Sequence, residues 1–187
     1  ATALGYGMQA APSGYPADWI GWPEDWIVWR GKTRNDPVRG AIARYLGDEL
    51  KANGINGEHL VLQVPEAKVF TNLRAAQEFV AAVSRHGCRV GLEQFGVGLD
   101  SFQLLSHFDP AFLKLDRSFM EELPKNAANQ GRVREIAGKA RSLGMRTIAE
   151  FVQDAASMAI LFTSGVDYVE GYFLAPAGPE MNYDFEQ

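Results

Sequence analysis

The feature that most constrains the fold is a repeated unit in which a short apolar strand ends in polar residues and leads into a helix. The stretch 89–102 shows the unit in full. Its strand ends in Glu93 and Gln94, and a glycine-rich turn then reaches Asp100 and Ser101, which suit a helix start. Because the carboxyl ends of parallel strands meet at one edge of a sheet, α/β proteins build their sites from such strand ends.

The same unit recurs along the chain. Four further predicted strands are 60–62, 112–113, 146–149 and 166–169, which end at Gln63, Lys114, Glu150 and Glu170. Another strand is predicted over 3–11, with Gln9 near its end. Helices are predicted over 38–50, 71–86, 133–143 and 155–163, from apolar residues at helical spacing. Repeated strand–helix units predict a parallel α/β fold whose polar strand ends share one rim.

Two architectures fit this pattern, a closed barrel and an open doubly wound sheet. The six strand candidates fall short of the eight that a closed (β/α) barrel needs. Polar residues at nearly every strand end nevertheless favour the barrel, because an open sheet gathers its site at one switch point. We therefore expect a barrel-like fold that lacks its first strands in this chain, whether or not it closes.

Composition excludes several classes of protein. With 47% hydrophobic residues in 187, we expect one domain with one core, and the net charge of -5 disfavours a nucleic-acid binder. The single cysteine excludes an internal disulfide and suits the cytoplasm. The sequence contains no apolar run of ~20 residues, so we expect no membrane insertion. The segment 12–35 is irregular and holds all four tryptophans. It is either a loop packed on the core or a patch that faces a partner.

Five segments, in order between residues 60 and 176, resemble the motifs of EAL domains, the cyclic di-GMP phosphodiesterases. Residues 60–66 are similar to the family's L-x-L-E-I-T-E strand, 91–98 to D-D-F-G-T-G, 113–119 to K-I-D-R-S-F, 149–153 to A-E-G-V-E and 167–172 to D-Y-x-Q-G-Y. The resemblance implies a TIM-barrel-like EAL fold. The strand with the E-A-L signature itself is not found, so 1–187 is expected to be one degenerate, N-terminally incomplete EAL domain.

The departures from the family pattern bear on catalysis. The resemblance implies hydrolysis by two divalent ions, which need a cluster of anionic oxygens. At three positions where the family has acidic ligands, this chain has Gln63, Gln94 and Gln153. Gln9 occupies the position of an asparagine in the family. We therefore expect no metal site, no cofactor and no phosphodiesterase activity.

The residues that match or replace family positions still suit the dinucleotide. Phe151 stands where the family usually has glycine, and it can stack on guanine with ~1–3 kcal/mol. Glu150 can accept from the guanine N–H edge, and Lys114 can contact a phosphate. The full predicted ligand-binding set is Gln9, Gln63, Glu93, Lys114, Glu150, Phe151, Gly171 and Pro176.

The Glu150–Phe151 pair resembles degenerate EAL domains that regulate type IV pili and bind cyclic di-GMP and a PilZ-type partner. The resemblance implies an inactive receptor that signals through such a partner. The alternative is an interaction module that has also lost the ligand. The residues have simpler interpretations too: Lys114 pairs with Glu93 or Glu150, Phe151 fills the former metal site, and 120–122 forms an acidic surface turn.

Overall fold

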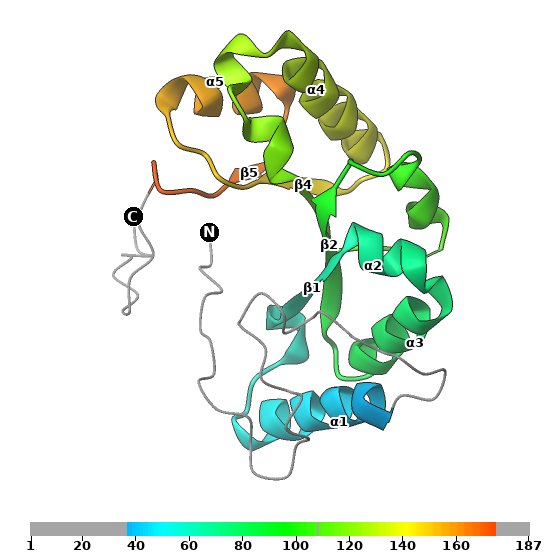
Figure 1. Cartoon of the computed structure of the whole chain (residues 1–187). Coiled ribbons are helices and arrows are strands. Elements are labelled where there is room, and N and C mark those ends of the chain that lie inside the picture. The colour runs from blue at the N-terminus through cyan, green and yellow to red at the C-terminus, as the bar shows by residue number, and fades with distance from the viewer. Residues whose placement is uncertain (1–36, 108, 175–187) are drawn as a thin grey trace.

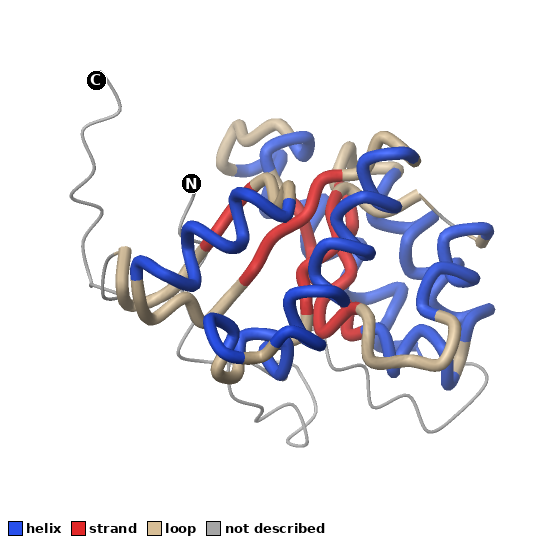
Figure 2. The backbone as a smooth tube through the Cα atoms, turned by 90° about the horizontal axis from the view of Figure 1, so that it is seen from above, coloured by secondary structure: helices blue, strands red, loops and turns tan. Residues whose placement is uncertain are grey.

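The structure, a computed structural model, describes residues 37–107 and 109–174. Its five strands form one parallel sheet in the order β1-β2-β3-β4-β5, namely Val61–Pro65, Arg89–Phe95, Phe112–Leu115, Arg146–Ala149 and Tyr168–Val169. The helices are α1 (Pro37–Ala52), α2 (Glu66–Thr71), α3 (Leu73–Ser84), α4 (Ala127–Ser142) and α5 (Ala155–Ser164). Figure 1 shows the helices along the outer side of the curved sheet, and Figure 2 shows the strands toward the middle of the molecule. The predicted parallel α/β fold is thus confirmed.

One face of the sheet is buried by the helices. Leu92, Leu113 and Leu115 are fully buried and belong to the main hydrophobic core. Because side chains alternate along a strand, their neighbours Glu93 and Lys114 lie on the opposite face. The sheet therefore directs its apolar residues toward the helices and its charged residues toward the inner face.

Several predicted boundaries shift: α4 begins at Ala127, β5 is limited to Tyr168–Val169, and β2 and β3 run on to Phe95 and Leu115. Two further corrections have clear physical causes. The helix expected over 71–86 is divided at Asn72, whose side chain accepts a hydrogen bond from Ala75 N and so starts α3 anew after α2. Gln63 was expected to end its strand. It lies in the middle of β1, opposite Gly91, because Val64 and Pro65 continue the pairing with β2.

Several predictions concern residues beyond the described ranges. The strand over 3–11 and the tryptophan-rich segment 12–35 fall there. Within the described ranges, none of the helices has the length and apolar character required to span a membrane.

A carboxylate fastens the last described strand to the sheet. Asp167, just before β5, accepts hydrogen bonds from Thr147 N at 2.9 Å and Thr147 Oγ1 at 3.0 Å. It also accepts one from Arg146 Nη1 at 2.9 Å. Burial acts to raise the pKa of Asp167, but the hydrogen bonds from Thr147 and Arg146 outweigh it and lower the pKa. This link fixes β5 beside β4, and so fixes the position of Glu170.

We expect Asp167→Ala to lower the free energy of unfolding by ~1–3 kcal/mol, because buried Thr147 then loses the acceptor of two donors. Urea denaturation at neutral pH measures the loss. Since the folded-state pKa of Asp167 is depressed, its contribution is present above the ordinary Asp pKa of ~3.9 and is lost as the pH falls further. Asp100→Ala, at an exposed aspartate without a capping hydrogen bond, is the control. Equal stability of the two variants would contradict the account.

Candidate ligand-binding site

A cluster of charged side chains lies at the carboxyl ends of β3, β4 and β5. Lys114 Nζ is 3.1 Å from Glu150 Oε2, and it also forms an ion pair with Glu170 Oε1. The pairing of Leu115 with Ala149 sets β3 beside β4, and Glu170 N donates to Ala149 O at 2.9 Å. The side chains of Lys114 and Glu150 are only 11% and 18% exposed, so this ion pair is largely removed from water.

Burial and mutual repulsion govern the charges in this cluster. Burial raises the pKa of Glu93 and of Glu150; Lys114 opposes the rise in both, and neighbouring carboxylates add to it. For Lys114, burial acts to lower the pKa, but Glu170 and Glu150 outweigh it and the pKa is raised. The ammonium of Lys114 therefore stays charged and serves as the counterion of three carboxylates.

This donor set does not fit a pair of divalent ions. Two of the three carboxylates already bind the Lys114 ammonium. Across residues 37–107 and 109–174, no group of three or more His, Cys, Asp or Glu side chains has an arrangement that could hold a metal ion. Gln94 is exposed with φ +52°, and Gln153 lies in the wall of a separate pocket. Lys114 itself matches the family's K-I-D-R-S-F motif, so the departure lies in the glutamines at 63, 94 and 153, which stand where the family has acidic ligands.

The retained Glu66 supports the backbone beside the cluster. It is 1% exposed, and its Oε2 accepts a hydrogen bond of 2.7 Å from Gly96 N, directly after β2. A Cβ at Gly98 would lie 2.5 Å from its other oxygen, so glycine is needed at this close approach. Glu66 therefore fixes the turn that follows Glu93 and Gln94.

Phe151 follows the cluster directly and has an unusual backbone. Its φ is +59°, in the left-handed region that bulky residues rarely adopt, and its side chain is 44% exposed. The loop is held by Val152 N, which donates to Glu170 O at 3.1 Å, and by Phe173 N, which donates to Val152 O at 3.2 Å. The backbone of Gly171 approaches Val152 too closely for any Cβ. These contacts therefore hold the Phe151 ring at the strand-end rim, where it is exposed and not buried as a plug.

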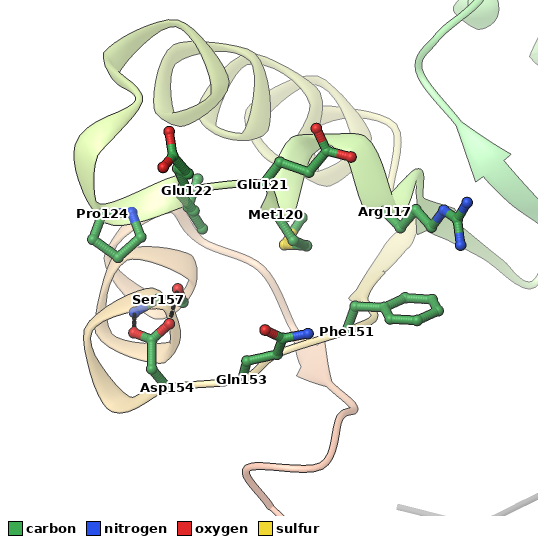
Figure 3. A pocket seen from close by; sticks show the side chains of 10 residues that line it. Arg117, Met120, Glu121, Glu122, Pro124, Phe151, Gln153, Asp154 and Ser157 are labelled. Atoms are coloured by element: carbon green, nitrogen blue, oxygen red, sulfur yellow. Dashed lines mark hydrogen bonds between the residues drawn. The ribbon is translucent and has the colours of Figure 1, made fainter.

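A pocket of about 410 Å³ lies beside Phe151 (Figure 3). Its lining residues are Arg117, Met120, Glu121, Glu122, Leu123, Pro124, Phe151, Gln153, Asp154 and Ser157. Asp154 caps α5 by accepting from Ser157 N at 2.7 Å, and Asp116 starts the short helix η5 (Arg117–Met120) by accepting from Ser118 N at 2.9 Å. These caps fix the two walls between which the pocket opens.

The structure brings together part of the predicted set. Glu93, Lys114 and Glu150 form one cluster, and the simpler interpretation of Lys114 as an ion-pair partner of Glu150 is confirmed. Gly171 lies against Val152, whereas Gln9 and Pro176 fall outside the described residues. Sequence reasoning missed Glu170 as the second partner of Lys114 and missed Arg117 in the pocket wall. Residues 120–122, predicted as an acidic surface turn, also line this pocket.

Comparison with known proteins assigns the family. The EAL domain family model matches residues 33–177. The EAL domain of Xanthomonas citri FimX in complex with cyclic di-GMP is 54% identical, with a TM-score of 0.74 over 81% of this chain and 58% of that chain. The cyclic di-GMP-bound FimX EAL domain of Pseudomonas aeruginosa is 30% identical, with a TM-score of 0.73 over 78% and 60%. Cyclic di-GMP phosphodiesterase PdeF of Escherichia coli is 28% identical over 125 residues, which are 67% of this chain and 17% of that protein.

The chain belongs to the EAL domain family, and its parallel sheet matches the TIM-barrel-like EAL fold of these neighbours. It spans less than two thirds of the FimX EAL chains and less than a fifth of PdeF.

We expect Lys114→Met to lower the free energy of unfolding by ~3–5 kcal/mol, because it leaves buried carboxylates without their counterion. The pKa values of Glu93 and Glu150, already raised, should rise further. A carboxylate whose folded-state pKa is raised destabilises the fold as the pH increases, so the loss should grow between about pH 4 and pH 7. Urea denaturation across this pH range measures whether the loss of unfolding free energy grows as the pH increases.

The double variant Lys114→Met with Glu150→Gln is the matched control, because it removes one unpaired charge and should recover part of the loss. A single variant whose stability does not depend on pH, or a double variant less stable than the single one, would contradict this electrostatic account.

Proposed function

We propose that this chain is part of a catalytically inactive cyclic di-GMP receptor that signals through a PilZ-type partner in the control of type IV pili. The similarity to FimX EAL domains bound to cyclic di-GMP supports the ligand. The partner and the pilus role rest on the resemblance of the Glu150–Phe151 pair to degenerate EAL domains that regulate pili.

The observation that carries the proposal is the backbone of Phe151. Holding a bulky residue at φ +59° costs about 1–3 kcal/mol, and such strain concentrates at ligand-binding sites. Glycine, the usual family residue here, would avoid this cost. The strained position presents an aromatic face, 44% exposed, at the rim where the strands end. A guanine base that stacks on this face is the interaction best suited to it.

The carboxylate of Glu150 supplies the complementary polar contact. It directly precedes Phe151 and has one oxygen paired with Lys114. A carboxylate accepts well from the N1–H and N2–H donors of guanine, while the adjacent ring stacks on the base. Stacking tolerates every base, whereas this edge contact selects guanine.

The absence of catalysis follows from the charge of the strand-end cluster. Hydrolysis in this family relies on two divalent ions close together. Here glutamines replace acidic positions at 63, 94 and 153, so fewer anionic oxygens remain for two ions. Lys114, which the family motif also carries, pairs with Glu150 and Glu170. Receptor function needs only stacking and hydrogen bonding, which these residues provide without metal ions.

We expect Phe151→Ala in the full-length protein to weaken cyclic di-GMP binding roughly five- to 150-fold, since stacking is worth ~1–3 kcal/mol. Calorimetric titration measures it. Phe151→Gly should weaken binding similarly while the unfolding temperature stays level or rises, because glycine tolerates a positive φ. This result would separate loss of ligand contact from loss of fold.

Phe162→Ala is the matched control, because Phe162 is a similarly exposed aromatic residue on α5 and is absent from the pocket lining. Failure of the parent protein to bind cyclic di-GMP would refute the receptor function and favour an interaction module. Binding that is indifferent to both Phe151 variants would show that another surface holds the ligand.

A further inference from the structure

The exposed face of Phe151 is covered by an arginine. Arg117 lies on η5, and its guanidinium carbon is 5.8 Å from the centroid of the Phe151 ring. Figure 3 shows both side chains at the same end of the pocket. A guanidinium at this distance is attracted by the ring's electron-rich face, by about 0.5–1 kcal/mol at an exposed site. A base that stacks on this face of the ring therefore meets Arg117 first.

Arg117 is free to rearrange when a base arrives. Its side chain is exposed, and within 37–107 and 109–174 no carboxylate forms an ion pair with it. Among the described residues that line the pocket, it is the one with a basic side chain. The weak contact with the ring is easily exchanged for a stronger one, and the long stem lets the guanidinium move to the edge of a stacked base.

The chemistry of guanine indicates what that stronger contact is. The O6 and N7 atoms of guanine are adjacent acceptors, and the planar fork of arginine matches them with two parallel hydrogen bonds. Adenine offers N7 beside an amino donor, so it lacks this acceptor pair. The N1–H and N2–H donors of guanine lie on a different edge and are left for Glu150.

We propose that Arg117 is a specificity-determining residue that leaves the Phe151 ring and binds O6 and N7 of the guanine stacked there; this rests on the proposed receptor function. Phe151 supplies base-tolerant stacking, and Arg117 supplies the recognition of guanine. Covering the ring in the free protein, Arg117 also shields an apolar face that is otherwise open to water.

The test is a thermodynamic cycle in which the protein loses the Arg117 side chain and the ligand loses the N7 acceptor. The full-length parent and its Arg117→Ala variant are titrated calorimetrically with cyclic di-GMP and with its 7-deaza analogue, in which carbon replaces N7. We expect Arg117→Ala to weaken cyclic di-GMP binding roughly five- to 150-fold. The analogue should bind the parent roughly tenfold more weakly than cyclic di-GMP does, but bind Arg117→Ala as well as cyclic di-GMP does. Arg117→Lys should not restore binding, because lysine lacks the fork.

Arg74→Ala is the matched control, because Arg74 is an exposed arginine on α3 whose loss changes the net charge equally. An Arg117→Ala variant that binds like the parent would overturn the proposal. So would a loss of affinity in Arg117→Ala while the parent binds both ligands equally, since Arg117 would then contact a phosphate. A parent that binds neither ligand would refute the receptor function itself, whereas parent binding lost in Phe151→Ala but kept in Arg117→Ala would refute only the role of Arg117.

Discussion

The ion pairs of Lys114 with Glu150 and Glu170 are the interaction on which the rest of the site depends. They join the end of β3 to the ends of β4 and β5, and the Lys114–Glu150 pair is largely removed from water, whereas Glu170 is half exposed. The strands themselves are joined by backbone pairing. Because a buried carboxylate needs a counterion, Lys114 stabilises the charged groups at the three strand ends. The loop that presents Phe151 begins at Glu150 and is hydrogen-bonded to Glu170 through Val152, so the cluster also sets the position of the aromatic ring.

Under the proposed receptor function, the same cluster accounts for ligand binding without hydrolysis. A two-metal centre needs a concentration of negative charge that metal ions neutralise. Here glutamine replaces several acidic positions, while Lys114, which the family motif also carries, is paired with Glu150. An aromatic residue occupies a strained position at the rim. In the proposed receptor, base stacking and edge recognition take the place of electrostatic activation of water, and neither needs a metal ion.

The sequence predicted the features that depend on local pattern. Strand–helix alternation gave the parallel fold, and polar residues at strand ends placed Glu93, Lys114 and Glu150 together. One miss has a local cause, and the others depend on tertiary pairing and packing. The break at Asn72 depends on a side-chain cap competing with helix continuation, and Gln63 lies mid-strand because Pro65 still pairs with β2. Arg117 meets Phe151 only because the turns after β3 and β4 pack side by side, which no spacing in the sequence encodes.

The central claim is recognition of cyclic di-GMP without metal ions and without hydrolysis. The most direct measurement is calorimetric titration of the full-length protein in EDTA, in Mg²⁺ and in Mn²⁺, with chromatography of the dinucleotide recovered afterwards. The account predicts the same affinity under all three conditions and an intact cyclic ligand. Binding that requires a divalent ion, or linear product formed at ~1 s⁻¹ or faster, would contradict it.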